Sequence, residues 1–166
     1  MGLTTSRQDL KIRRDPDQPG QYLLETGILL PDSLDRVFAF FADAFELETI
    51  TPPWLHFHVL TLRPISMQLG QLIDYKLKLR GLPVRWQSEI TAWEPPFRFV
   101  DEQVRGPYRK WHHEHTLEKH PDGTLVSDRV EYAVPGGWLV NSLFVKRDLE
   151  KIFRFRHEKL REIFSA

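Results

Sequence analysis

Residues 108–134 read YRKWHHEHTLEKHPDGTLVSDRVEYAV, and this stretch decides the expected fold. Many apolar and aromatic side chains alternate with polar and charged ones on both sides of Pro121-Asp122-Gly123, a tripeptide typical of tight turns. Alternation with a period of two places every second side chain on the same face of a strand. The stretch therefore predicts two antiparallel strands joined by a short turn, each with one face toward the core.

Strand-like patterns also occupy most of the sequence before this hairpin. Each of these segments is bounded by proline, glycine or acidic residues that favour turns. Their alternating faces are typical of an antiparallel sheet that is half buried. The segments predicted as strands are 21–30, 55–60, 72–79, 84–92 and 97–105.

Helical periodicity occurs in two parts of the chain. Residues 138–164 repeat apolar side chains three or four positions apart between charged ones, which predicts one long amphipathic helix. Two shorter helical runs follow the first strand, the first capped by Asp32 or Ser33 and the second ending at Thr51-Pro52-Pro53. The order is thus strand, two short helices, six strands and a long helix.

A curved antiparallel sheet of about seven strands, wrapped around the terminal helix, buries all these apolar faces at once. We therefore expect an α+β fold. Residues 21–166 are long enough for one domain with its own core. Residues 1–20 are polar and rich in turn-forming residues, so we expect a flexible N-terminal arm.

Composition excludes several classes of protein. The 23 lysine and arginine residues are balanced by 23 acidic residues, so no broad basic surface is expected to hold a nucleic acid. No segment is apolar enough for an integral membrane helix, and the absence of cysteine excludes disulfides and thiolate metal sites. We expect a soluble, cytoplasmic protein.

The strand faces expected to point inward carry polar side chains as well as apolar ones. A buried polar group without a partner is costly. These residues must therefore satisfy one another, or they must line a cavity in which something else satisfies them. The residues are Tyr75, Trp86, Ser88, Asp101, Gln103, Trp111, His113, His115, Asp128 and Tyr132.

Four motifs, together with this order of elements, resemble the helix-grip or SRPBCC superfamily. That superfamily contains START lipid-transfer domains, birch-pollen-allergen-like proteins and polyketide cyclase/dehydratases. The resemblance covers nearly the whole chain after residue 20 and is closest to small bacterial cyclase/dehydratase-like members. The motifs are Thr51-Pro52-Pro53-Trp54-Leu55, Trp86-x-Ser88-x-Ile90, Phe99-x-Asp101-x-Gln103-x-x-Gly106-Pro107-Tyr108 and Trp111-x-His113-x-His115.

The resemblance implies a deep, mostly apolar cavity between the sheet and the terminal helix. The leading hypothesis is that this cavity binds a small hydrophobic or amphipathic molecule without a cofactor. Fold membership alone does not fix the chemistry, because the superfamily includes transporters, sensors and enzymes. The residues expected to contact the ligand are Phe57, Tyr75, Leu77, Trp86, Ser88, Phe99, Asp101, Gln103, Trp111, His113, His115, Tyr132, Leu149 and Phe153.

His113 and His115 are the main candidates for chemistry, because residues two apart on a strand point the same way. With Asp101 or Asp128 from neighbouring strands they permit a structural hydrogen-bond network, a polar wall that orients a ligand, or acid-base catalysis. The catalytic alternative is an enzyme of the polyketide cyclase/dehydratase type that uses a His/Asp pair. The same residues have metal-ligand spacing, but a firm third ligand is missing and we expect no metal.

Overall fold

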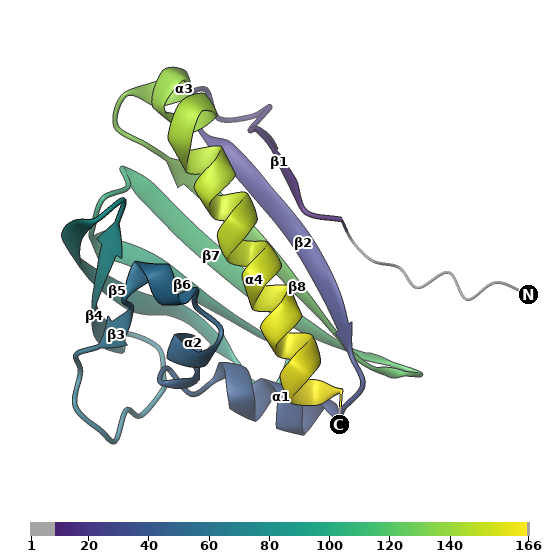
Figure 1. Ribbon diagram of the computed structural model, residues 1–166. Coiled ribbons are helices and arrows are strands. Elements are labelled where there is room, and N and C mark those ends of the chain that lie inside the picture. The colour runs from purple at the N-terminus through teal and green to yellow at the C-terminus, as the bar shows by residue number, and fades with distance from the viewer. Residues whose placement is uncertain (1–8, 166) are drawn as a thin grey trace, which may run out of the picture.

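The structure is a computed structural model, and it describes residues 9–165. In this part of the chain, eight strands form one antiparallel sheet in the order β1-β2-β8-β7-β6-β5-β4-β3. The sheet curves around the long terminal helix (Figure 1), which confirms the α+β architecture. The strands are β1 (Lys11–Arg14), β2 (Tyr22–Leu30), β3 (His58–Val59), β4 (Leu72–Leu79), β5 (Leu82–Glu94), β6 (Arg98–Arg105), β7 (Lys110–His120) and β8 (Gly123–Ala133).

Two short helices follow β2, as the sequence predicts. Helix α1 (Leu34–Phe41) begins after Ser33, whose hydroxyl accepts a hydrogen bond from the Arg36 backbone N–H at 3.4 Å. Helix α2 (Glu46–Thr49) and the 3-10 turn η1 (Pro53–Leu55) complete the connection to β3. Figure 1 shows α1 near the C-terminal end of the long helix and α2 beside it.

The terminal helical run matches the long helix predicted over residues 138–164, but it contains a local irregularity. Helix α3 (Gly137–Val140) continues through a π-helical segment, η2 (Asn141–Val145), into α4 (Lys146–Phe164). The segment buries Asn141, whose side-chain oxygen accepts a hydrogen bond from the Tyr132 hydroxyl at 2.8 Å. This bond attaches the start of the run to β8.

The prediction of a flexible arm over residues 1–20 is wrong for Lys11–Arg14. These residues form strand β1, which pairs with β2 along the register Lys11 to Glu25 through Arg14 to Tyr22. Charged side chains are common on edge strands, and here they concealed the strand signal. Ile12 packs against the core cluster that contains Tyr22 and Leu24 of β2. The remainder of the predicted arm includes residues 1–8, which lie outside the described residues.

The strand predicted over residues 55–60 is much shorter in the structure. Only His58 and Val59 pair with β4. Pro53 begins the 3-10 turn η1, and His56 at its end adopts a left-handed backbone conformation with φ of 45°. The left-handed residue interrupts the extended chain that an alternating pattern requires.

The long helix contacts the two halves of the sheet differently. Leu160 and Phe164 pack with residues of α1, β2, β7 and β8, and Leu149 and Phe153 pack with β2 and β8. The core cluster on the other half contains Ile73, Tyr75 and Ile90 of β4 and β5, with partners from the loops and short helices but none from α4. The sheet therefore meets the helix firmly on one side only.

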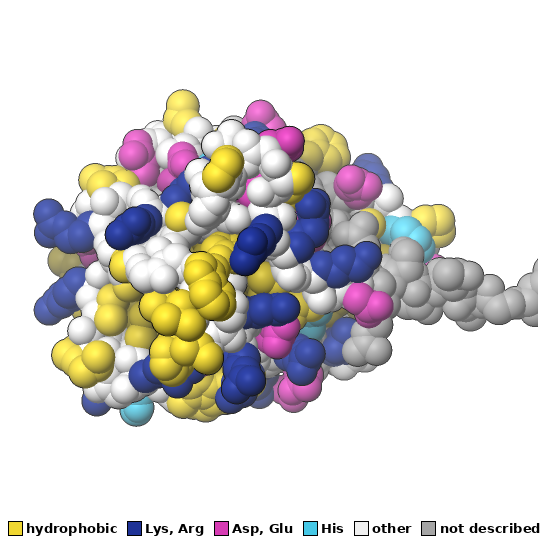
Figure 2. Space-filling model, turned by 90° about the horizontal axis from the view of Figure 1, so that it is seen from above, with side chains coloured by type: hydrophobic (Ala, Val, Ile, Leu, Met, Phe, Trp, Pro, Cys, Tyr) yellow, Lys and Arg dark blue, Asp and Glu magenta, His cyan; other side chains and the backbone are white. Residues whose placement is uncertain are grey.

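The end of the molecule that carries α3 has an apolar surface. Figure 2 looks onto this end and shows apolar side chains gathered among Lys and Arg. The exposed apolar residues of α3 and η2 are Trp138, Leu139, Leu143 and Phe144. No helix within residues 9–165 is long and apolar enough to cross a membrane.

Candidate functional site: a cavity under the terminal helix

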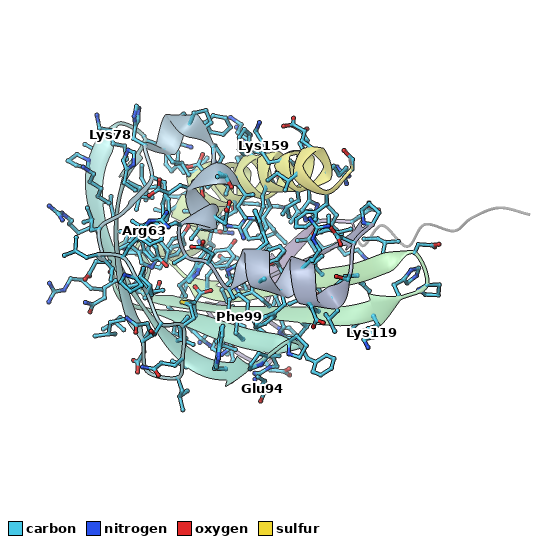
Figure 3. The ribbon with its side chains drawn as sticks, turned by 90° about the horizontal axis from the view of Figure 1, so that it is seen from below. Arg63, Lys78, Glu94, Phe99, Lys119 and Lys159 are labelled. Atoms are coloured by element: carbon cyan, nitrogen blue, oxygen red, sulfur yellow. The ribbon has the colours of Figure 1, made fainter. Side chains whose placement is uncertain are left out.

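A cavity of about 170 Å³ lies where the helix and the β4–β5 half of the sheet fail to meet. Side chains of β4, β5, β6 and β7 form its walls, the short helices and their loops contribute one end, and α4 covers it. Figure 3 views the molecule from below, with Phe99 between the curved sheet and the short helices and Lys78 at the outer edge. The curvature of the sheet thus leaves a hollow beneath the helix as well as a core.

Most of the residues expected to contact a ligand border this cavity. Tyr132 does not, because it lies fully buried against Tyr22 and binds Asn141. Gln103 also lies outside the lining. The expected residues that do line it are Phe57, Tyr75, Leu77, Trp86, Ser88, Phe99, Asp101, Trp111, His113, His115, Leu149 and Phe153.

The side chain of Gln103 has a structural partner instead of a place in the cavity. Its Nε2 donates to the Tyr108 carbonyl at 2.7 Å, and its Oε1 accepts from the Tyr108 N–H at 3.0 Å. A Cβ atom on Gly106 would overlap the Gln103 amide. The Gln103-x-x-Gly106-Pro107-Tyr108 motif therefore closes the β6–β7 turn, which corrects its interpretation as a ligand contact.

The register of the sheet brings the two histidines and two aspartates together. Asp101 on β6 lies opposite His113 on β7, and Asp128 on β8 lies opposite His115. Since residues two apart on β7 share a face, each histidine reaches both the opposite and the diagonal aspartate. The sequence predicted this juxtaposition as one of its possible arrangements, and the structure confirms the placement.

Two short hydrogen bonds join these four side chains. His113 Nε2 lies 2.7 Å from Asp128 Oδ1, and His115 Nε2 lies 2.7 Å from Asp101 Oδ2. His115 Nδ1 also approaches Asp128 Oδ1 to 3.2 Å, an ion-pair distance without hydrogen-bond geometry. Asp128 is the most enclosed of the four and lies behind the histidines, away from the cavity lining.

Ring stacking holds the imidazoles in place. The rings of His113 and His115 stack with centroids 3.8 Å apart, and Phe99 stacks on His115 at 4.2 Å. Trp111 and Phe153 contact His113 at centroid distances of 6.0 and 5.9 Å. The imidazoles are thus fixed between aromatic side chains at the cavity wall.

The two histidines differ in charge because their surroundings differ. Burial lowers the pKa of His113 below its ordinary 6.5, and the nearby charge of His115 lowers it further. Burial opposes the charge of His115 as well, but Asp101 and Asp128 outweigh burial and raise its pKa to about 8. Asp128 keeps a pKa well below its usual value because the histidines outweigh the effect of burial. At neutral pH, His115 is charged and His113 is neutral.

Asp101, His113 and His115 place three possible metal-ligating atoms within 4.8 Å of one another. The nearest carboxylate oxygens are already engaged in 2.7 Å hydrogen bonds with the imidazoles. A buried arginine, Arg156, adds a positive charge beside them. These features favour a hydrogen-bonded network over a cation site.

An aromatic group forms the wall next to the histidines. Trp86 meets Tyr108 and Trp111 edge-to-face, with centroids 5.5 and 5.4 Å apart. The Trp86 indole N–H donates to the Ser88 hydroxyl at 2.9 Å, so this polar pair satisfies itself. Tyr108 was not among the predicted contacts, although it lines the cavity.

Arg156 is the functional candidate that sequence reasoning missed. It lines the cavity from α4 and is only 8% exposed. Its position continues the apolar stripe of the helix, where Leu149, Phe153 and Leu160 are buried. A charged residue in the middle of an apolar stripe is the sequence signal that would have identified it.

Solved structures resemble this one over nearly their full length. Protein Ms6760 from Mycobacterium smegmatis is 16% identical with a TM-score of 0.68, covering 95% of this chain and 99% of that one. Major latex-like protein 151 from Panax ginseng is 12% identical with a TM-score of 0.65, covering 88% and 99%. Ara h 8.0201 is 14% identical with a TM-score of 0.65, covering 87% and 97%. The fold is thus the helix-grip fold of the birch-pollen-allergen-like proteins.

Residues 50–164 match the model of a protein family described as "Domain of unknown function (DUF8410)". The chain belongs to this family. The matched region contains the His/Asp network, the aromatic wall and Arg156. No curated protein matches the chain.

Proposed function

We propose that this protein binds a small hydrophobic or amphipathic molecule in the cavity beneath α4. One observation carries the proposal: the inward side chains of β4 and β5 face open space instead of the helix. Space of about 170 Å³ is similar in size to the ~150 Å³ engineered cavity that binds benzene. Apolar walls with a few convergent polar groups are typical of ligand sites.

A small neutral probe, 3-phenylpropan-1-ol, tests this binding role. Titration followed by ¹H–¹⁵N NMR should give saturable shifts confined to residues around the cavity. Leu77→Trp places a large ring in the cavity and should weaken binding by about tenfold or more. Leu82→Trp makes the same change at the exposed start of β5 and is the matched control.

Two results would contradict the binding role. One is the absence of saturable shifts in the unmodified protein. The other is equal affinity in the Leu77→Trp and Leu82→Trp variants, since that would place the probe outside the cavity. Both variants must first show the dispersed spectrum of a folded protein.

A second candidate function is a cyclase or dehydratase activity in the same cavity. The observation that favours it is the neutral His113, held by Asp128 at 2.7 Å and facing the cavity from a wall of aromatic rings. A neutral imidazole oriented by a carboxylate suits a general base. The neighbouring His115 and Tyr75 would supply charge and a hydroxyl near the reacting group.

Turnover of an aromatic poly-β-ketone or β-hydroxy-ketone precursor, followed by absorbance, tests the enzymatic role. His113→Gln should abolish turnover while ligand binding by NMR persists. If His113→Gln loses thermal stability and the unmodified protein turns over no such precursor, His113 belongs to the structural network instead.

A further inference from the structure

Arg156 lies on the face of α4 that points toward the sheet. Leu149, Phe153, Arg156 and Leu160 follow one another at helical spacing, and all four are buried. The three neighbours are apolar, yet the fourth position carries a guanidinium that borders the cavity. The helix therefore directs a cation into the space where we propose that a ligand binds.

This guanidinium lacks a hydrogen-bond acceptor among residues 9–165. Its Nε is buried without a partner, and its Cζ lies 4.8 Å from the centroid of the Phe153 ring. Asp101 and Asp128 attract it electrostatically. Their nearest oxygens, however, already bind the two histidines at 2.7 Å. A buried cation with free donors is costly unless something else supplies acceptors.

We propose that Arg156 binds the carboxylate of a small amphipathic acid whose hydrophobic part occupies the cavity. The inference rests on the proposed binding function and adds the chemical class of the ligand. The two oxygens of a carboxylate match the planar fork of a guanidinium in geometry and in charge. An alcohol of the same size offers one neutral oxygen and cannot make that paired contact.

The charges around Arg156 permit an incoming carboxylate. Asp101 and Asp128 carry two negative charges, which are offset by the protonated His115 and by Arg156 itself. The polar end of the cavity is therefore close to neutral before a ligand binds. An acid would place its carboxylate beside the buried Nε of Arg156, which has no hydrogen-bond partner of its own.

The test compares 3-phenylpropanoate with 3-phenylpropan-1-ol, which share a hydrophobic part and differ in the head group. The unmodified protein should bind the acid about tenfold more tightly than the alcohol, or better. Arg156→Met keeps an unbranched side chain and should remove that preference, while affinity for the alcohol stays within about threefold. Arg154→Met removes an exposed cation from the same helix and should leave both affinities unchanged.

Each outcome separates this inference from the binding function on which it rests. Equal affinity for acid and alcohol in the unmodified protein would overturn the role of Arg156 while leaving the cavity as a binding site. Failure of both probes to bind would overturn the binding function itself. If Arg156→Met does not fold, Arg156→Lys keeps the charge without the fork and should weaken only the acid. Unchanged acid binding in Arg156→Lys would then contradict the paired contact.

Discussion

Asp128 is the most enclosed charge of the site, with a side chain only 2% exposed. It accepts a hydrogen bond from His113 and faces the charged His115 at 3.2 Å. Removing one partner of a buried ion pair leaves the other charge without compensation. The stability of the network therefore depends on this carboxylate more than on the partly exposed Asp101.

Replacing Asp128 with asparagine keeps the size of the side chain but removes its charge. We expect Asp128→Asn to lower the free energy of unfolding by about 3 kcal/mol or more. Urea denaturation at neutral pH measures this loss. Asp122→Asn changes an exposed carboxylate in the β7–β8 turn and serves as the control. A loss in Asp128→Asn no larger than in the control would show that the network does not depend on the charge.

The raised pKa of His115 gives a pH dependence of defined sign. The folded protein holds this proton up to a pKa of about 8, whereas the unfolded chain releases it near the ordinary value of 6.5. The stabilisation is therefore complete below about pH 6.5 and is lost as the pH rises through about 8, a change of about 2 kcal/mol. Urea denaturation across this range should show the decline.

His115→Gln should remove this slope, and His120→Gln, outside the network, should keep it. A slope that survives in His115→Gln would assign the titration to another group. The lowered pKa of His113 acts in the opposite direction, because below about pH 6.5 the unfolded chain gains a proton that the folded state does not. Together the two histidines favour maximum stability near pH 6.5.

At the residue scale, alternation predicted which side chains would meet. His113, His115, Asp101 and Asp128 come together because a period of two fixes the face of each strand. Gln103 has the same period, yet it binds the Tyr108 backbone across a turn. Alternation carries no information about which inward side chain a nearby backbone will engage, so that role needed the structure.

At the scale of elements, the two halves of the sheet differ in how tightly they pack. Leu117 on β7 is buried between the sheet, α1 and the end of α4. Leu77 on β4 is also buried, but it borders the cavity. Both are strand leucines, so they report on the packing of the two halves with the same side chain.

Truncation of these leucines should therefore have unequal effects. Leu117→Ala removes contacts on all sides and should destabilise the fold by about 3–5 kcal/mol. Leu77→Ala removes a side chain that already lacks packing partners on its cavity side and should cost about 2 kcal/mol, the low end for a buried leucine. Chemical denaturation of the two variants compares them. Equal losses would indicate that the β4 half packs as tightly as the other half.

The elements themselves were largely predictable, because long alternating strands and an amphipathic helix give strong patterns. Strand β1 was not, since its charged residues resemble those of a solvated arm. Arg156 is a charged residue at a position of the apolar stripe, and the expected ligand contacts on this helix include only apolar residues. The pairing of β1 depends on a distant part of the chain, which local periodicity does not contain, whereas the signal of Arg156 lies within the helical pattern itself.

At the scale of the whole molecule, the motifs and the order of elements led to the correct fold. The hollow between sheet and helix is a different kind of property, because it depends on how far a curved sheet stands from the helix. Leu160 and Phe164 pack against the core at one end of the helix, and an exposed ion pair of Arg80 with Asp148, at 2.9 Å, links the helix to the β4–β5 turn near the other. No local sequence pattern encodes that distance.

A crystal structure determined under xenon pressure tests the hollow most directly, since xenon enters apolar cavities without a specific contact. We predict a xenon site beneath α4, bordered by Ile73, Ile90, Leu149 and Phe153. The contradicting result is a structure without xenon in this region, in which the side chains of α4 contact those of β4 and β5 directly.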